Sequence, residues 1–190
     1  MKLALLRHAH SIMNGKGIID YAHICYGLST EGFAQALTLI PKIENYNPDL
    51  IITSPMKRAI QTIEPFLAKK SIEHIISTYL AERNAGEFEG RVESSVREHC
   101  EHHGLDRVSF KPIGGESIKE AYERAQKFVE WLRKLDKERV LAVSHSAMAM
   151  CLEFVVTGRF IENYYNNSER LRNGELRVFE VSYVKNHLLK

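Results

Sequence analysis

Cationic side chains follow three short apolar runs of this chain, at the point where each run ends. Arg7 and His8 come directly after the first run, Arg58 follows the second, and His145 follows the third. Because parallel strands of an open α/β sheet end at the same edge, where such folds bind their ligands, we expect these four side chains to gather there. The pattern therefore predicts a cationic site for an anion.

The types of these residues indicate the chemistry of the site. The planar guanidinium forks of Arg7 and Arg58 match the oxygens of a phosphoryl group. One histidine, with an ordinary pKa of about 6.5, can act as a neutral nucleophile, and the other can donate a hydrogen bond to a phosphoryl oxygen. A helix predicted to begin at Ser146 directs free N–H groups into the same crevice. Glu82, which follows a predicted strand over residues 72–79, is the candidate proton donor for the leaving oxygen.

Alternating strand and helix signals supply the scaffold for this site. Apolar runs predict strands, with an edge strand last, over residues 3–6, 49–53, 72–79, 139–144 and 174–185. Between them, apolar residues at helical spacing predict helices. We therefore expect a three-layer α/β/α fold with a mostly parallel central sheet. It forms one domain over residues 1–190, with a small capping insertion over residues 85–115.

Caps and helix breakers predict where the first two helices begin and end. The first helix takes Ser29 or Thr30 as its N-cap, ends near Pro41, and places four apolar residues on one face: Phe33, Ala36, Leu37 and Ile40. The second helix takes Ser54 as its cap. Pro55 lies in its first turn, where a missing N–H is tolerated.

A histidine-rich helix follows, and it is stopped by Gly104. His99 and His103 have the spacing of two metal ligands on one helix face. Histidines in a last helical turn also suit the negative end of the helix dipole. Because the sequence places no third ligand beside them, we predict no metal site. A long amphipathic helix then covers residues 118–132.

The composition excludes several classes of protein. Lys and Arg total 26 against 24 Asp and Glu, a net charge of +2, which gives no general basic surface for nucleic acid or an anionic membrane. The apolar runs are too short for a signal peptide or a membrane span. Three cysteines, Cys25, Cys100 and Cys151, form no CxxC pair, which favours a reducing compartment. We expect a soluble, cytoplasmic protein.

Five ordered segments together carry a family resemblance. The run RHAHSIMN resembles the Arg-His-Gly-x-Ser/Thr-x-x-Asn signature of the histidine phosphatase superfamily, the phosphoglycerate mutase-like proteins. Four further segments agree in order and spacing: LSTEGFAQA with Gly32 and Gln35, SPMKRAIQT with Arg58, Gln61 and Thr62, LAERNAGEFEG with Glu82, Gly86, Glu89 and Gly90, and VSHS with His145. The run GGES at 114–117 is also usual in this superfamily. The resemblance spans essentially the whole chain.

The resemblance implies a role for each matching residue. His8 is the nucleophile that takes up the phosphoryl group, and Glu82 protonates the leaving alcohol and then activates water. Three side chains hold the phosphoryl oxygens, Arg7, Arg58 and His145, while Asn14 and Ser146 line the substrate pocket. The family uses no metal, and we expect no cofactor.

Three residues depart from the family pattern. Ala9 replaces the usual glycine, His10 replaces a common glutamate, and Ser146 replaces a frequent glycine. None of these changes removes a catalytic group, so we expect them to affect substrate preference. Two further assignments have alternatives, because Glu87 or Glu89 can replace Glu82 as the proton donor and Asn14 can simply cap a turn.

The sequence therefore predicts a metal-independent phosphomonoester hydrolase that works through a phosphohistidine. A phosphoglycerate mutase shares the whole catalytic set and is the alternative among enzymes. A non-catalytic module that binds phosphorylated ligands is a weaker alternative, since a binding protein needs neither a nucleophile nor an acid. The expected partner is a small phosphorylated molecule, not nucleic acid or a membrane. The sequence leaves the substrate and the oligomeric state open.

Overall fold

The computed structural model describes residues 1–20, 26–166 and 170–182. Its centre is a five-stranded sheet in the order β3-β2-β4-β1-β5. The strands are β1 (Lys2–Arg7), β2 (Leu50–Thr53), β3 (His74–Ile76), β4 (Arg139–Ser144) and β5 (Leu176–Glu180). The first four run parallel, and β5 pairs antiparallel with β1 at one edge. The predicted α/β fold with a mostly parallel sheet is thus confirmed.

The register of the sheet brings the cationic residues to one edge. Arg7 pairs with Ser144 at the carboxyl ends of β1 and β4, and Thr53 pairs with Val143 at the end of β2. The residues that follow these pairs, among them His8 and His145, therefore leave the sheet side by side. This arrangement follows from the parallel direction of the three central strands.

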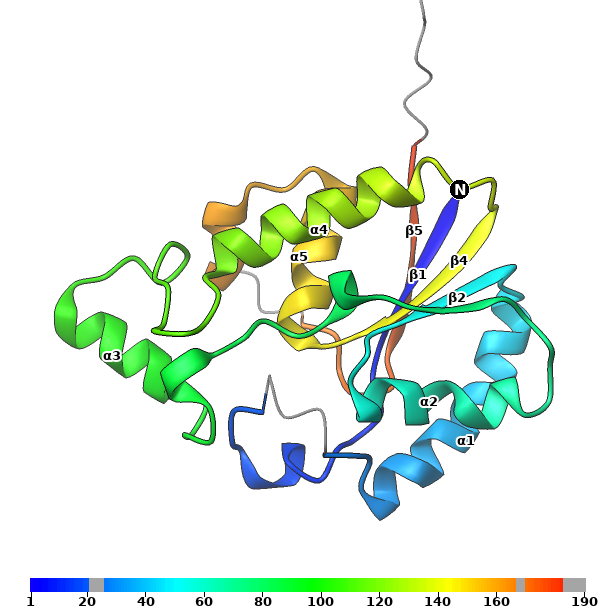
Figure 1. Ribbon diagram of the computed structural model, residues 1–190, viewed down its shortest axis with the longest axis horizontal. Coiled ribbons are helices and arrows are strands. Elements are labelled where there is room, and N and C mark those ends of the chain that lie inside the picture. The colour runs from blue at the N-terminus through cyan, green and yellow to red at the C-terminus, as the bar shows by residue number, and fades with distance from the viewer. Residues whose placement is uncertain (21–25, 167–169, 183–190) are drawn as a thin grey trace, which may run out of the picture.

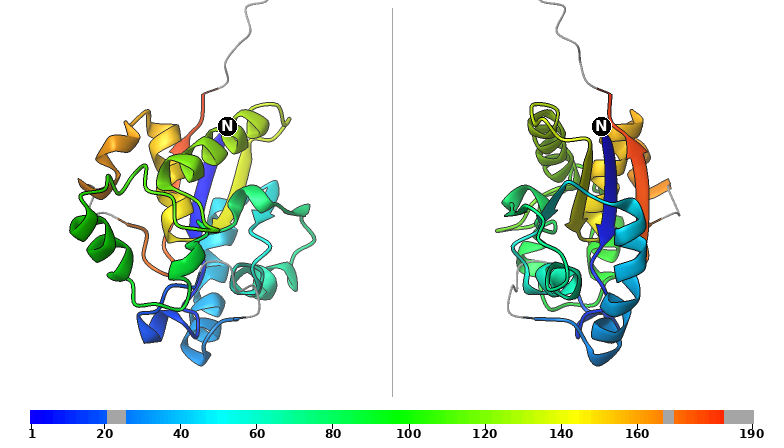
Figure 2. Two further views of the ribbon diagram at one scale, coloured as in Figure 1. Left: turned by 60° about the vertical axis from the view of Figure 1, so that its left-hand side comes forward. Right: turned by 90° about the vertical axis from the view of Figure 1, so that its right-hand side faces the viewer.

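Helices cover both faces of the sheet and form the outer layers (Figures 1 and 2). One face packs against α4 (Ile118–Leu132) and α5 (Ser146–Thr157), and the other against α1 (Thr30–Tyr46) and α2 (Lys57–Leu67). Successive strand residues point to opposite faces, so β1 contributes alternately to the two cores. Burial on both sides explains why the central strands read as continuous apolar runs.

The first helix runs past the proline at which we predicted its end. Ser29 is the N-cap, with its hydroxyl accepting from the Gly32 N–H at 3.1 Å, but α1 continues through Pro41 to Tyr46. Pro41 lies on the exposed side, so water can satisfy the carbonyl that loses its N–H partner. The buried stripe is also rotated from the predicted one, because Phe33 and Leu37 are exposed.

Two other predicted boundaries are wrong. The second helix begins at Lys57, with Met56 as its N-cap, and not at Ser54. The Ser54 hydroxyl accepts from the N–H of the N-cap residue Met56 at 3.2 Å and also lies 2.7 Å from a ring nitrogen of His145. The strand predicted over residues 72–79 shortens to β3, and a 3₁₀ turn, η2 (Thr78–Leu80), follows it. Glu82 therefore lies in an irregular segment two residues beyond that turn.

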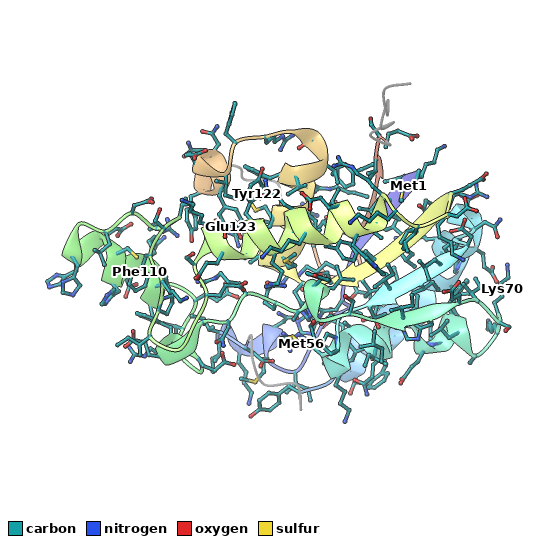
Figure 3. All side chains as sticks on the ribbon, turned by 45° about the horizontal axis from the view of Figure 1, so that its top comes forward. Met1, Met56, Lys70, Phe110, Tyr122 and Glu123 are labelled. Atoms are coloured by element: carbon teal, nitrogen blue, oxygen red, sulfur yellow. The ribbon has the colours of Figure 1, made fainter. Side chains whose placement is uncertain are left out.

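The α3 segment, residues 85–115, lies to one side of the sheet and its helices (Figure 1). Figure 3, in which Phe110 is labelled, shows the same separation from another direction. Its helices are η3 (Gly86–Phe88) and α3 (Ser95–His103), which ends at Gly104 in the left-handed conformation, as predicted. The segment has a small core of its own, built from Ile19, Ala85, Phe88, Val96 and Cys100.

The remaining elements are two 3₁₀ helices, η1 (Asn14–Lys16) and η4 (Ile161–Asn166). Cys100 and Cys151 are buried free thiols, and Cys25 lies outside the described residues, as do the last residues of the strand predicted over 174–185. Across the part of the chain that the structure describes, every helix falls short of the length and apolar character that a membrane span requires.

Candidate active site

Three different elements hold the backbone of the His8 segment. The His8 N–H donates to the Ser144 carbonyl of β4 at 2.9 Å, which extends the β1–β4 ladder by one residue. The His8 carbonyl accepts from Asn173 Nδ2 at 3.0 Å, and the next N–H, of Ala9, donates to Thr62 Oγ1 of α2 at 2.9 Å. A segment fixed on three sides presents its side chain in one orientation.

The His8 ring is set in one tautomer. Its Nδ1 lies 2.7 Å from the Ala9 carbonyl oxygen. Because a carbonyl can only accept, Nδ1 carries the proton and Nε2 keeps its lone pair. Burial, together with the positive charges of Arg58 and Arg7, holds the pKa of His8 well below its usual range. The ring is therefore neutral at pH 7 and able to act as a nucleophile.

The second histidine lies directly against the first. The ring centroids of His8 and His145 are 5.0 Å apart, and His145 is fully buried. Its Nε2 lies 2.7 Å from Ser54 Oγ, and its Nδ1 is buried without a hydrogen-bond partner among the described residues. Burial, Arg58 and His8 all lower the pKa of His145. The sequence pattern predicts only a capping role for Ser54, and the contact with His145 was not predicted.

The two predicted clamp arginines are anchored but point to the same site. Arg7 donates through Nη1 to the Leu171 carbonyl at 2.9 Å. Arg58, in the first turn of α2, donates through Nη2 to the Asp20 carbonyl at 2.8 Å and through Nη1 to the Asp20 carboxylate at 3.2 Å. The sulfur of Met56, labelled in Figure 3, lies 3.1 Å from Arg58 Nη2. A cation there faces the positive end of the helix dipole, and Asp20 compensates it.

Glu82 lies at the N-terminus of α5. Its carboxylate accepts the N–H groups of Ala147 at 3.1 Å, Met148 at 3.0 Å and Arg83 at 2.9 Å. The first two are free N–H groups of a helix start, which suit a negative charge. The side chain is buried, yet it lines the same cavity as His8.

The alternative acids lie elsewhere. Glu87 is exposed and accepts the Ile113 N–H at 3.1 Å. Neither Glu87 nor Glu89 is among the described residues that line the cavity, where the carboxylates are Asp20, Glu82 and Glu93. Of these three, Asp20 pairs with Arg58 and Glu93 is exposed. The geometry therefore favours Glu82 among the candidate proton donors.

Asn14 is oriented by a residue from the far end of the chain. Its Oδ1 accepts from the Ser11 N–H at 3.0 Å, from the Ser11 hydroxyl at 3.0 Å and from Asn173 Nδ2 at 3.1 Å. With the oxygen occupied, the amide Nδ2 of Asn14 is the group left to face the cavity that this residue lines. Gln35 supports the same contact, because its Nε2 donates to the Asn173 carbonyl at 2.6 Å. Asn173 was not predicted, since 159 residues separate it from Asn14.

One cavity of about 520 Å³ joins these groups. It is lined by six of the predicted site residues, namely Arg7, His8, Asn14, Arg58, Glu82 and Ser146. His145, the seventh, is fully buried and reaches the site through the His8 ring.

Within the described residues, no group of three or more His, Cys, Asp or Glu side chains is arranged to hold a metal ion. The His99 and His103 rings pack against each other at a tilt of 48°, with centroids 4.6 Å apart.

Comparison with known families identifies this arrangement. The family model described as histidine phosphatase superfamily (branch 1) matches residues 3–190. The chain belongs to the histidine phosphatase superfamily.

Two of the residues that depart from the family pattern, Ala9 and His10, lie next to His8 in the sequence. Ala9 is fully buried, and His10 is not among the described residues that line the cavity. His10 Nδ1 lies 2.9 Å from Ser29 Oγ, at the start of α1.

Named relatives of the chain are phosphatases. It is 28% identical over 170 residues to the putative phosphoserine phosphatase 2 of Hydrogenobacter thermophilus, covering 87% of this chain and 83% of that protein. It is also 28% identical over 180 residues to the fructose-2,6-bisphosphatase TIGAR of Xenopus tropicalis, covering 92% of this chain and 66% of that protein.

Solved structures share the superfamily fold. A mycobacterial glucosyl-3-phosphoglycerate phosphatase superposes with a TM-score of 0.82 at 20% identity, covering 93% of this chain and 91% of the other. The alpha-ribazole phosphatase of Shigella flexneri superposes with a TM-score of 0.83 at 24% identity, covering 96% and 91%. At these identities the likeness concerns the fold alone.

Proposed function

We propose that the protein is a metal-independent phosphomonoester hydrolase that acts through a phosphohistidine on His8. The single observation that carries this proposal is the 2.7 Å contact between His8 Nδ1 and the Ala9 carbonyl. It directs a neutral nitrogen lone pair, at Nε2, into a cavity rich in arginine. The relatives named as phosphatases support the same conclusion.

In the first step His8 Nε2 attacks phosphorus, and the bond to the leaving alcohol breaks. Arg7 and Arg58 hold the non-bridging oxygens, because charge on these oxygens must be balanced throughout the transfer. His145 is not among the described cavity-lining residues, and we assign it the role of packing against the His8 ring. Glu82 gives its proton to the leaving oxygen. The Asn14 amide, oriented through Asn173, adds a donor toward the substrate.

In the second step water attacks the phosphohistidine. Glu82, now a carboxylate, takes a proton from this water, and the N–P bond breaks to release inorganic phosphate and the neutral His8 ring. One carboxylate can serve both steps, since each needs a proton transfer at the same side of phosphorus. Glu82 and His8 line one cavity, which supports this assignment.

The α3 segment, residues 85–115, is proposed as a cap over the site. It contributes five residues to the cavity wall: Glu93, Ser94, Val96, Arg97 and Arg107. A mutase must keep its phosphorylated intermediate away from water, a demand usually met by a larger closing region. We therefore expect hydrolysis to be the main outcome. Rapid conversion of 3-phosphoglycerate to 2-phosphoglycerate with a bisphosphoglycerate primer, and little free phosphate, would instead identify a mutase.

A rapid-quench experiment tests the intermediate. Turnover of a radiolabelled phosphomonoester, quenched in alkali, should trap a phosphoryl group that is stable in alkali and labile in acid, as a phosphoramidate is. His8→Ala should lose the label and several orders of magnitude in rate. His10→Ala is the matched control, because His10 does not line the cavity, and it should keep both. A label on serine, aspartate or cysteine rules out the proposal.

Chelation tests the metal independence. Because the guanidinium groups of Arg7 and Arg58 are proposed to supply the positive charge at the phosphoryl oxygens, excess chelator should leave turnover nearly unchanged. Loss of activity with chelator, restored by zinc or magnesium, would contradict this part of the proposal.

A further inference from the structure

The cavity extends well beyond the residues that handle the phosphoryl group. At about 520 Å³ it falls in the range of sites that hold whole small molecules. Six described arginines line it, of which only Arg7 and Arg58 belong to the proposed clamp; the others are Arg83, Arg97, Arg107 and Arg170. The three lining carboxylates do not match this charge.

Arg107, one of these arginines, is held over an aromatic ring. Its guanidinium carbon lies 3.7 Å from the centroid of the Tyr165 ring, close enough for stacking. Its Nε is buried and has no hydrogen-bond partner within the described residues. A stacked guanidinium keeps its N–H edge free for a planar or tetrahedral anion. A buried N–H without an acceptor is also costly, so an anion at this edge would be stabilised.

Two more arginines, Arg83 and Arg170, line the same cavity. Arg83 is buried and fixed by a 3.0 Å bond from Nη1 to the Glu116 carbonyl. Burial raises the pKa of Tyr165, while the positive charges of Arg83, Arg107 and Arg170 act in the opposite direction. The guanidinium carbon of Arg170 lies 5.4 Å from the centroid of the adjacent Tyr164 ring. The three cations come from the residue after Glu82, from the α3 segment and from the chain after η4.

Among the described residues, four carboxylates near this cavity are engaged elsewhere, and a fifth, Glu93, is exposed. Asp20 pairs with Arg58, and Glu82 accepts the N–H groups at the start of α5. Glu116 is bidentate to Arg124, with distances of 2.9 and 2.7 Å. Asp106, the neighbour of Arg107 in sequence, accepts the N–H groups of Val108 and Ser109.

We propose that Arg83, Arg107 and Arg170 form a second anion subsite, which binds a carboxylate or phosphate carried by the same substrate whose phosphoryl group reacts at His8. This inference rests on the proposed function and names its substrate class, namely phosphomonoesters with a second anionic group. A single continuous cavity contains both the His8 end and the Arg107 end, so one molecule can occupy both.

The test uses alkyl phosphates of three to six carbons whose far end is a methyl group, a carboxylate or a second phosphate. The wild-type protein should show a kcat/KM at least tenfold higher for a doubly anionic compound than for its methyl counterpart. Arg107→Ala should remove most of that preference, mainly through KM, and leave the methyl series within twofold. The two anionic series show whether carboxylate or phosphate is preferred.

Arg91→Ala is the matched control. Arg91 also lies in the α3 segment and over an aromatic ring, 5.0 Å from the Phe88 centroid, but it is exposed and outside the cavity lining. Arg91→Ala should leave kcat/KM unchanged for the methyl, carboxylate and phosphate series. If the ratio of kcat/KM for the doubly anionic substrate to kcat/KM for its methyl counterpart is the same in the wild type and in Arg107→Ala, the subsite is overturned.

Calorimetry with the matching phosphonates, which cannot turn over, separates this proposal from the proposed function. If no ester is hydrolysed, the proposed function fails, and the subsite is still decided by binding. Tighter binding of the doubly anionic phosphonate that Arg107→Ala abolishes supports the subsite, and equal binding by both proteins rejects it.

Discussion

The Asp20 carboxylate lies 3.2 Å from Nη1 of Arg58, and both side chains are almost fully buried. An acid therefore neutralises one of the cations that are proposed to hold the phosphoryl group. A phosphate that binds Arg58 must share it with Asp20 or displace the carboxylate. The pair tunes how strongly the site attracts anions, because a buried charge pair interacts far more strongly than one in water.

Asp20→Asn should strengthen phosphate binding. The amide keeps the shape of the side chain but removes the negative charge beside Arg58, so inorganic phosphate should inhibit the variant at a concentration about tenfold lower. Without phosphate the variant should lose up to ~3 kcal/mol of unfolding free energy, since Arg58 is left buried and less compensated. Added phosphate should restore this loss.

Asp49→Asn provides the control for this change. Asp49 accepts the N–H groups of Glu138 and Arg139 at 2.7 and 3.2 Å, next to the amino ends of β2 and β4 and outside the cavity lining. Its loss should reduce stability without altering phosphate inhibition. Equal inhibition constants for the wild type and Asp20→Asn contradict the role given to the Asp20 pair.

The buried histidines predict how stability depends on pH. Burial holds the pKa of His8 and of His145 well below 6.5, so between the folded pKa and about 6.5 the unfolded chain binds more protons than the folded one. The stability that these residues contribute is fully present above about pH 6.5 and is lost as the pH falls below it. Each group can contribute a slope of at most ~1.4 kcal/mol per pH unit.

Urea unfolding in phosphate-free buffer between pH 5 and 7.5 measures this effect. His8→Gln should unfold with a shallower dependence on pH than the wild type, because one of the groups that cause it is gone. His74, on the edge strand β3, also has a pKa lowered by burial. It therefore lowers the stability at acidic pH equally in the wild type and in His8→Gln, and does not affect the comparison. Parallel pH curves for the wild type and His8→Gln would show that the ring does not stay neutral in the folded protein.

Gly32 is required by a close contact and not by its backbone angles. A Cβ at this position would lie 1.9 Å from the His10 carbonyl oxygen, which is where α1 packs on the loop after His8. Gly32→Ala should therefore cost ~2–4 kcal/mol of unfolding free energy and should reduce turnover, because the His8 loop must move. Helix propensity alone predicts the opposite sign, a gain of roughly 1 kcal/mol.

Gly90→Ala is the comparison for this substitution. Gly90 has a φ of +78°, but a Cβ added there would meet no atom within 4 Å among the described residues, so only conformational strain opposes the change. It should cost ~1 kcal/mol and leave turnover intact. If Gly32→Ala is as mild as Gly90→Ala in chemical unfolding, the contact with His10 does not explain the glycine.

Local patterns in the sequence were enough to predict the sheet and the residues at its edge. Arg7, His8 and His145 directly follow apolar runs, and parallel strands must bring their ends together. The end of α1 was missed because the local rule for Pro41 ignores which side of the helix faces water. Asp20, Ser54 and Asn173 were missed because their roles depend on contacts across the chain, which leave no local pattern.

Glu82→Gln should separate substrates by their leaving groups. An alkoxide is a poor leaving group without a proton, whereas p-nitrophenolate needs almost none. The two α5 N–H groups donate to different oxygens of Glu82, so the single amide oxygen can keep only one of these contacts, and the amide cannot act as the acid. Hydrolysis of alkyl phosphates should therefore fall by roughly 10²–10⁴-fold, while cleavage of p-nitrophenyl phosphate in the first step changes little.

The same variant should also accumulate the intermediate, because Glu82 is proposed to activate the water that attacks it. A burst of p-nitrophenol, followed by slow turnover, is the expected time course. Glu87→Gln and Glu89→Gln are the matched controls, since neither residue is among the described cavity-lining residues, and both should behave as the wild type does. A uniform loss on both substrate types in Glu82→Gln, or a leaving-group effect in either control, would assign the proton transfer to another group.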